Sequence, residues 1–211
     1  MLITFEGGIR SGKSTQAKKL FKHFKSQNKP VFINREPGGP TAAEDIRKIL
    51  LNPDAELAQL TEFLLYQAAR AELVEKFVKQ NLEKDRIVIL DRYIDSTYAY
   101  QGHGRGINTD FITEFEKLVA RGFIPDLTFI LTIKPEKALN RTLKTKVNYL
   151  ESRFENEELE FHQKVQQGYL ERYRLEKKKG KERIHIIDGD QSKNEVFKQI
   201  LDLVKLKRRK M

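Results

Sequence analysis

The sequence contains no cysteine among its 211 residues. Disulfide bridges and thiolate-bound metal sites are therefore excluded. It also has no apolar run long enough to span a bilayer. The chain opens on a strand-like segment instead of the charged-then-apolar pattern of a secretory signal. We therefore expect a cytoplasmic protein with no membrane partner.

Internal repeats, low-complexity segments and Pro/Gly-rich linkers are lacking as well. The 211 residues suffice for one well-buried domain, so we expect residues 1–211 to form a single domain. The net charge is +10, which fits nucleic-acid binding or lysine-rich solvated helices in a protein that binds anionic nucleotides. The basic residues are scattered along the chain, and the one dense run, KLKRRKM, is terminal. We favour the second interpretation and expect no nucleic-acid partner.

Apolar, β-branched runs alternate with segments of helical periodicity. The runs read as strands buried on both faces, and they occupy residues 2–5, 31–34, 87–91, 127–132 and 184–188. Helical patterns cover residues 13–26, 42–51, 57–83, 109–121, 135–146, 157–175 and 192–207. This alternation predicts an α/β fold with a five-stranded parallel sheet and helices on both faces. Ligands of such sheets bind beyond the carboxyl ends of the strands.

A phosphate-binding loop follows the first strand. Gly7, Gly12, Lys13 and Ser14 fit the pattern G-x-x-x-x-G-K-[ST]. Glycine allows the backbone N–H groups to point at phosphate oxygens, lysine reaches the β- and γ-phosphates, and the serine hydroxyl can bind Mg²⁺. An ordinary glycine-rich turn is the alternative, but the strand before it and the helix after it favour nucleotide binding.

Polar residues also follow other predicted strands. Asp91 can hold Mg²⁺ through water or cap a helix, and these two roles are compatible. Arg92 beside it is available for an acceptor phosphate. Arg35, Arg47 and Arg70 are further basic candidates, although surface ion pairs are the default role of the two that lie on predicted helices, Arg47 and Arg70.

The segment of about 140–158 is polar and basic. It contains Arg141, Lys144, Lys146 and Arg153. A mobile flap of this kind would exclude water and stabilise charge during phosphoryl transfer. A solvated connection between helices is the alternative. We expect a lid in this segment.

Five segments, in the same order from Leu2 to about Asp188, resemble the thymidylate kinase family: FEGGIRSGKSTQ, REPGGPTAAEDIRKILL, LLYQAARAELVE, ILDRYIDSTYAYQGHGRG and SRFENEELEFHQKVQQGYLE. The resemblance implies a P-loop NTPase-type fold and a homodimer. It further implies transfer of the γ-phosphoryl group of ATP to dTMP with Mg²⁺, giving dTDP for dTTP synthesis. A kinase with a changed monophosphate acceptor and a non-catalytic nucleotide-binding paralogue remain alternatives.

The resemblance also implies residue roles. Tyr66 would stack on thymine and Arg70 would hydrogen-bond its edge. Arg92, helped by Arg47, would bind the dTMP phosphate, and Tyr100 would crowd the sugar 2′ position. The implied ATP-binding residues are Gly7, Gly8, Ile9, Arg10, Ser11, Gly12, Lys13, Ser14 and Thr15. The implied substrate-binding residues are Glu36, Arg47, Tyr66, Arg70, Arg92, Ser96, Tyr100 and Gln101. The implied metal-binding residues are Ser14 and Asp91, and the implied catalytic residues are Arg10, Lys13, Asp91 and Arg153.

Two positions depart from the family pattern. Ile9 stands where the family usually has Asp or Glu near the acceptor's sugar and phosphate, and Pro40 replaces the usual Thr. Arg10, by contrast, matches members that place a catalytic arginine in the loop. We expect ATP binding to survive these changes, whereas one acceptor contact is missing.

Overall fold

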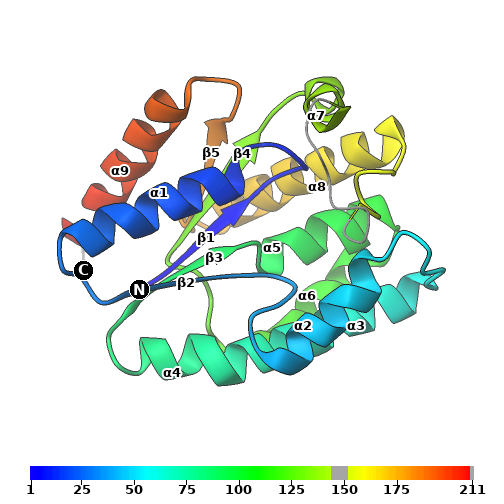
Figure 1. Ribbon diagram of the computed structural model, residues 1–211, viewed down its shortest axis with the longest axis horizontal. Helices are drawn as coiled ribbons and strands as arrows, with labels where there is room; N and C mark the ends of the chain where they lie inside the picture. The colour runs from blue at the N-terminus through cyan, green and yellow to red at the C-terminus, as the bar shows by residue number, and fades with distance from the viewer. Residues whose placement is uncertain (144–151, 210–211) are drawn as a thin grey trace.

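A computed structural model describes residues 1–143 and 152–209. These residues form a five-stranded parallel sheet in the order β2-β3-β1-β4-β5 (Figure 1). The strands are β1 (Leu2–Glu6), β2 (Val31–Arg35), β3 (Ile87–Asp91), β4 (Leu127–Thr132) and β5 (Ile184–Asp188). The predicted α/β fold is confirmed, and the strand bounds agree with the sequence to within one residue.

Burial on both faces explains why the strands are continuously apolar. All five residues of β1 are buried. Ile3 and Phe5 enter a core layer that also contains Leu20 and Val196, whereas Leu2 enters the layer on the opposite face. Because successive side chains of a strand point to opposite faces, each face needs its own apolar set.

Helices cover both faces of the sheet (Figure 1). One face carries α1 (Lys13–Ser26) and α9 (Lys193–Arg209). The opposite side carries a larger set: α2 (Thr41–Leu51), α3 (Gln59–Leu73), the π-helical η1 (Val74–Val78), α4 (Lys79–Leu82), α5 (Ile94–Thr97), the π-helical η2 (Tyr98–Gly104), α6 (Thr109–Ala120) and α8 (Leu159–Lys178). The predicted helix 57–83 corresponds to α3, η1 and α4 in succession.

The sequence patterns miss the helical stretch 94–104. This stretch, α5 and η2, includes Gly102 and Gly104, and glycine disfavours helix formation. Its position is fixed by α8, whose Gly168 lies so close that an added Cβ would stand 2.9 Å from the Cα of Ala99. Packing between elements distant in sequence therefore determines this helical stretch.

The predicted helix 135–146 begins as expected. It forms α7 (Pro135–Leu143), and its remaining residues lie outside the described part of the chain. The predicted lid, about 140–158, is likewise described only at 140–143 and 152–158, so Lys144 and Lys146 are not placed. Among the described helices, none combines the length and apolar character that a bilayer crossing requires.

Candidate active site

The phosphate loop takes a conformation that only glycine accommodates at two positions. Gly7 has φ of +131°, and a Cβ there would lie 2.2 Å from the carbonyl oxygen of Leu131. Gly12 has φ of +98° and immediately precedes α1. The loop thus delivers the N-terminus of α1 to the carboxyl edge of the sheet, where its partial positive charge favours an anion.

Lys13 extends its ammonium group into this loop. Its Nζ donates a hydrogen bond of 2.5 Å to the carbonyl oxygen of Gly8. Burial lowers the pKa of Lys13 to about 7, with a further contribution from the nearby Arg92 charge. A bound polyphosphate would supply the negative charge that favours the protonated amine.

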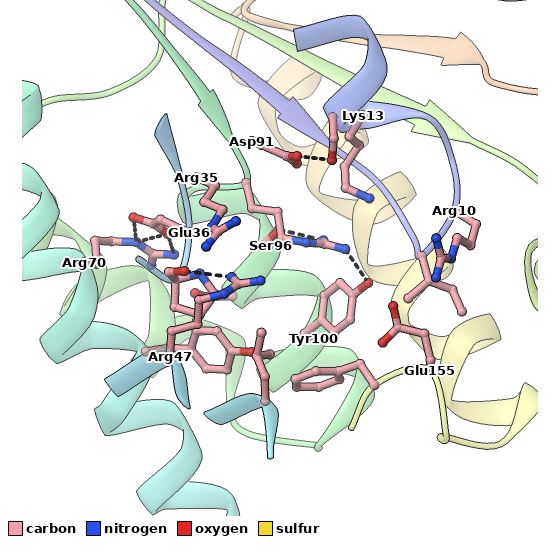
Figure 2. A pocket seen from close by; sticks show the side chains of 18 of the residues that line it. Arg10, Lys13, Arg35, Glu36, Arg47, Arg70, Asp91, Ser96, Tyr100 and Glu155 are labelled. Atoms are coloured by element: carbon pink, nitrogen blue, oxygen red, sulfur yellow. Dashed lines mark hydrogen bonds and ion pairs between the residues drawn. The ribbon is translucent and has the colours of Figure 1, made fainter. Parts of the chain in front are cut away.

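Ser14 and Asp91 meet across the loop. The Ser14 hydroxyl donates a hydrogen bond to the Asp91 carboxylate, although the two residues come from α1 and β3 (Figure 2). Both line the same cavity. A hydroxyl and a carboxylate are the oxygen ligands that Mg²⁺ takes in kinases, so this pair fits the predicted metal site.

A cavity of about 600 Å³ lies beside the loop, at the carboxyl edge of the sheet. Most predicted site residues line it: Ile9, Arg10, Gly12, Lys13, Ser14, Thr15, Glu36, Arg47, Tyr66, Arg70, Asp91, Arg92, Ser96, Tyr100 and Gln101. Gly7, Gly8 and Ser11 belong to the loop but not to the cavity wall. The strands therefore gather residues far apart in sequence into one site, as their polar carboxyl ends predict.

Arg92 stands at the centre of this cavity wall. It has a left-handed backbone, φ +73°, directly after β3. Its guanidinium donates to the carbonyl oxygen of Gly7 at 3.0 Å, to Ser96 Oγ at 3.2 Å and to Tyr100 Oη at 3.0 Å. The planar guanidinium is therefore fixed between the phosphate loop and the η2 segment, where it can bind a phosphate oxygen.

Arg70 forms a buried pair with Glu36. Arg70 Nε and Nη2 donate to the Glu36 carboxylate at 3.0 and 2.6 Å, and Nη2 also donates to the carbonyl oxygen of Tyr93. Burial raises the pKa of Glu36, and the Arg70 charge opposes that rise. The carboxylate thus orients Arg70 at the cavity wall and occupies much of its hydrogen-bonding capacity.

Aromatic rings form the far wall of the cavity. Tyr100 meets Phe154 edge to face, with ring centroids 5.5 Å apart, and Tyr66 lies 6.3 Å from Phe154. Leu51 completes this wall. Rings arranged in this way provide flat apolar surfaces for a nucleobase.

Arg153 does not line the cavity. Its Nη2 lies 2.8 Å from a Glu62 carboxylate oxygen, and its Nη1 donates to the carbonyl oxygen of Leu50. The segment that carries it is thereby attached to α2 and α3. The catalytic role predicted for Arg153 therefore stays a prediction, and the position observed here gives it no support.

Ile9 packs into a small apolar cluster with Ile133, Ala138 and Leu139, and only 6% of it is exposed. Its side chain offers no hydrogen bond to an acceptor. Neither Asp95 nor Glu36 replaces the carboxylate missing at position 9, because Asp95 is fully buried and Glu36 is already paired with Arg70.

The Asp95 carboxylate lies beneath the site in a buried ion cluster. It accepts hydrogen bonds from Arg172 Nε at 2.9 Å and from Arg183 Nη1 at 2.7 Å. Burial alone would raise the pKa of Asp95, but the two guanidinium groups outweigh it and hold the pKa below its usual range. Asp95 directly precedes Ser96, which lines the cavity. The buried ion cluster therefore holds this part of the cavity wall in place.

Several cavity residues escaped the sequence analysis as site candidates. Phe154 and Glu155 belong to the segment after the undescribed residues, and Pro37 belongs to REPGG, whereas Arg35 of the same segment was a basic candidate and does line the cavity. Glu155 points into the cavity near Tyr100 (Figure 2). Position within the recognisable segments SRFE and REPGG was the available signal, but it did not reveal which side chains face the cavity.

Comparisons with known proteins agree with one another. A family model described as thymidylate kinase matches residues 5–200. The thymidylate kinase of Chlorobaculum parvum is 42% identical over 207 residues, which cover 95% of this chain and 94% of the relative. That of Halothermothrix orenii is 40% identical over 205 residues, covering 97% and 96%. A crystal structure of thymidylate kinase from Ehrlichia chaffeensis superposes with a TM-score of 0.77 at 33% identity, covering 97% of this chain and 98% of that one.

Proposed function

The chain belongs to the thymidylate kinase family and phosphorylates dTMP, and we propose that it uses ATP and Mg²⁺ in the cavity beside the phosphate loop. The observation that carries the proposal is the meeting of Lys13, Ser14 and Asp91 at one end of the cavity with Arg92 beside them. The comparisons with known thymidylate kinases confirm the family and the reaction that the sequence resemblance implied.

In this proposal the reaction joins two phosphates held at the same edge of the sheet. A dTMP phosphate oxygen attacks the γ-phosphorus of ATP, the bond to the β,γ-bridging oxygen breaks, and ADP leaves with that electron pair. The attacking oxygen is already anionic, so the step needs no strong general base. Lys13, Arg10 and Arg92 would hold the phosphates in line and stabilise their charge.

Ser14 and Asp91 would hold the metal ion. When bound, Mg²⁺ neutralises charge on the phosphate oxygens. The existing hydrogen bond between the two side chains keeps both oxygens at one point of the cavity. The chain thus presents a hydroxyl and a carboxylate without a large rearrangement of its backbone.

The acceptor would occupy the aromatic end. Tyr66 and Phe154 present faces for the base, and Arg92 lies where the acceptor phosphate approaches the loop. The Tyr100 hydroxyl accepts a hydrogen bond from Arg92, and its ring packs on Phe154, so the side chain is held in place. If the sugar passes over this ring, a ribose 2′-hydroxyl would clash with it. Deoxyribose preference therefore follows from a fixed Tyr100.

Removing Mg²⁺ tests the metal part of the proposal. We expect dTDP formation from ATP and dTMP to fall by at least about tenfold with a chelator and to recover when Mg²⁺ is restored, since the ion stabilises transition-state charge. The measurement is ADP release under otherwise identical conditions. Full turnover in chelator would contradict the metal assignment, although it would leave the acceptor assignment intact.

We further propose that the protein is a homodimer through α3 and α6. Exposed apolar side chains gather on these two helices, at Leu60, Leu64, Phe111 and Leu118. The ring centroids of Phe63 on α3 and Phe111 on α6 lie 5.6 Å apart, so the two helices present one continuous surface. Covering such a patch is favourable in water. Sedimentation should give twice the chain's 24.7 kDa, whereas a monomer mass at micromolar concentration would contradict the proposal.

A further inference from the structure

Most of the net positive charge of the protein lies on two helices. Helix α1 contains five lysines and no acidic residue, and α9 contains four lysines and two arginines against two acidic residues. Lys13 belongs to the phosphate loop, and without it these two helices carry a formal net charge of +8, whereas the whole chain carries +10. The basic residues are scattered along the sequence, but folding gathers them.

The two helices lie side by side on the same face of the sheet (Figure 1). At one end, Gln16 Nε2 donates to the carbonyl oxygen of Lys193 at 3.0 Å, and Lys19 Nζ donates to Asn194 Oδ1 at 2.8 Å. At the other end, the Arg208 guanidinium lies over the Phe24 ring. The helices therefore run parallel and form one surface, which we call the α1–α9 face.

In the described part of the chain, the lysines of this face are not paired with carboxylates. Among the ion pairs of residues 1–143 and 152–209, none involves a lysine of α1 or α9, and Lys19 Nζ donates only to neutral oxygen atoms. Some lysines on other elements are paired with carboxylates, such as Lys48 with Asp45 and Lys117 with Glu114. Like charges at i and i+4, as at Lys18 and Lys22, repel one another. An anionic partner would relieve this repulsion.

Aromatic rings are interleaved with the cations. Lys19 Nζ lies 4.9 Å from the centroid of Phe197, and Lys25 Nζ lies 5.9 Å from that of Phe21. Both rings are partly exposed. Cations beside accessible rings suit a chain of phosphates and bases, since the cations meet phosphates and the rings offer stacking surfaces.

A membrane surface fits the α1–α9 face less well. An interfacial helix inserts an apolar stripe into the bilayer. Here the apolar stripes of both helices are buried against the sheet, including Leu20, Phe24, Val196, Ile200 and Val204. Leu206 is the only large hydrophobic side chain exposed on the described parts of these helices. The solvent-facing side of the two helices is therefore charged and has no apolar stripe that could enter a bilayer.

The α1–α9 face is also separate from the kinase site. Apart from Lys13, none of its lysines lines the nucleotide cavity among the residues described. The exposed patch on α3 and α6 lies across the sheet, so a homodimer of the kind proposed above leaves the α1–α9 face accessible. Its charge therefore serves neither substrate binding nor that assembly.

We propose that the α1–α9 face binds the phosphodiester backbone of nucleic acid without reading base sequence. Lysine contacts to phosphates release condensed counterions, which drives binding and makes it steeply dependent on salt. This replaces the expectation, drawn from the sequence alone, that the protein has no nucleic-acid partner. DNA and RNA present the same backbone charge, so both belong to the ligand class.

The test compares two charge-matched triple variants with the parent. The face variant carries Lys18→Gln, Lys22→Gln and Lys25→Gln, all exposed on α1. The control variant carries Lys76→Gln, Lys84→Gln and Lys164→Gln, exposed lysines across the sheet. Both lose three charges, so the comparison separates the α1–α9 face from net charge. None of the six residues lines the nucleotide cavity.

Binding is measured by fluorescence anisotropy with labelled single strands of about 20 nucleotides, as DNA and as RNA, over a series of salt concentrations. We expect the parent to bind, and the face variant to lose about tenfold or more in affinity near 50 mM salt. Its slope of log K against log salt should fall by about 2, which is three phosphate contacts at about 0.7 each for single strands. The control variant should stay within about threefold of the parent, and ADP release should be unchanged in all three proteins.

Three results would overturn the proposal. The first is no binding of either strand at low salt. The second is equal weakening in both triple variants, which would indicate net charge alone. The third is binding to vesicles of anionic phospholipid, lost in the face variant, without binding to either strand, which would identify a lipid surface instead. Since kinase turnover is recorded in parallel, these outcomes are independent of the dTMP kinase assignment.

Discussion

The variant Lys13→Ala is expected to lose on the order of 10²–10³-fold in kcat for dTMP phosphorylation, or about 2.7–4 kcal/mol of transition-state stabilisation. Lys13 is buried beside the loop backbone, and its Nζ is held by the carbonyl oxygen of Gly8. A charge positioned in this way costs no reorganisation when the phosphoryl group transfers. Alanine removes the charge and leaves the loop glycines unchanged.

The measurement is steady-state ADP release at saturating ATP and dTMP. Lys22→Ala is the matched control, because Lys22 is exposed on the same helix and lines no part of the nucleotide cavity. That control should keep the parent kcat. Turnover of Lys13→Ala within about threefold of the parent, a difference of well under 1 kcal/mol, would show that the loop assignment is wrong.

The variant Asp95→Ala is expected to lower the free energy of unfolding by about 3–5 kcal/mol. Asp95 is fully buried and accepts hydrogen bonds from Arg172 and Arg183. Alanine would leave the two guanidinium groups in the interior without the carboxylate that compensates them. The remaining neighbours, Glu116 at 3.9 Å from Arg172 and Glu176 at 2.7 Å from Arg183, offset only part of that loss.

Urea unfolding of the parent and the variant measures this difference. The control is Asp45→Ala, since Asp45 forms an exposed pair with Lys48 at 2.6 Å. Exposed pairs contribute little because water solvates both partners, so the control midpoint should match that of the parent. Equal midpoints for Asp95→Ala and Asp45→Ala would mean that the buried cluster does not stabilise the fold.

The sequence predicts those features that depend on local pattern. The five strands follow from continuous apolar runs, and the phosphate loop follows from Gly7, Gly12, Lys13 and Ser14 in the strand–loop–helix context. The gathering of Asp91 and Arg92 at the loop follows because parallel strands end at the same edge. These inferences require no knowledge of which distant helices meet.

Features that depend on distant packing are not visible in the sequence. The helical stretch 94–104 depends on the close approach of Gly168, and the position of Phe154 depends on Tyr66 and Tyr100. The pairing of Arg153 with Glu62 joins residues from two separate segments. The α1–α9 face forms only because the first and the last helical patterns, which come from opposite ends of the chain, pack side by side.

The central claim is that the cavity lined by Tyr66, Arg92 and Tyr100 accepts dTMP for phosphorylation by ATP. The most direct measurement is kcat/KM over a panel of monophosphates with the same ATP and Mg²⁺ throughout. The panel contains dTMP, ribothymidine monophosphate (the ribose counterpart of dTMP), UMP, dCMP and dGMP. A site with a fixed aromatic wall and a fixed Tyr100 predicts dTMP to be preferred over every other acceptor by at least about tenfold. A better acceptor than dTMP, or equal use of dTMP and its ribose counterpart, would contradict the account.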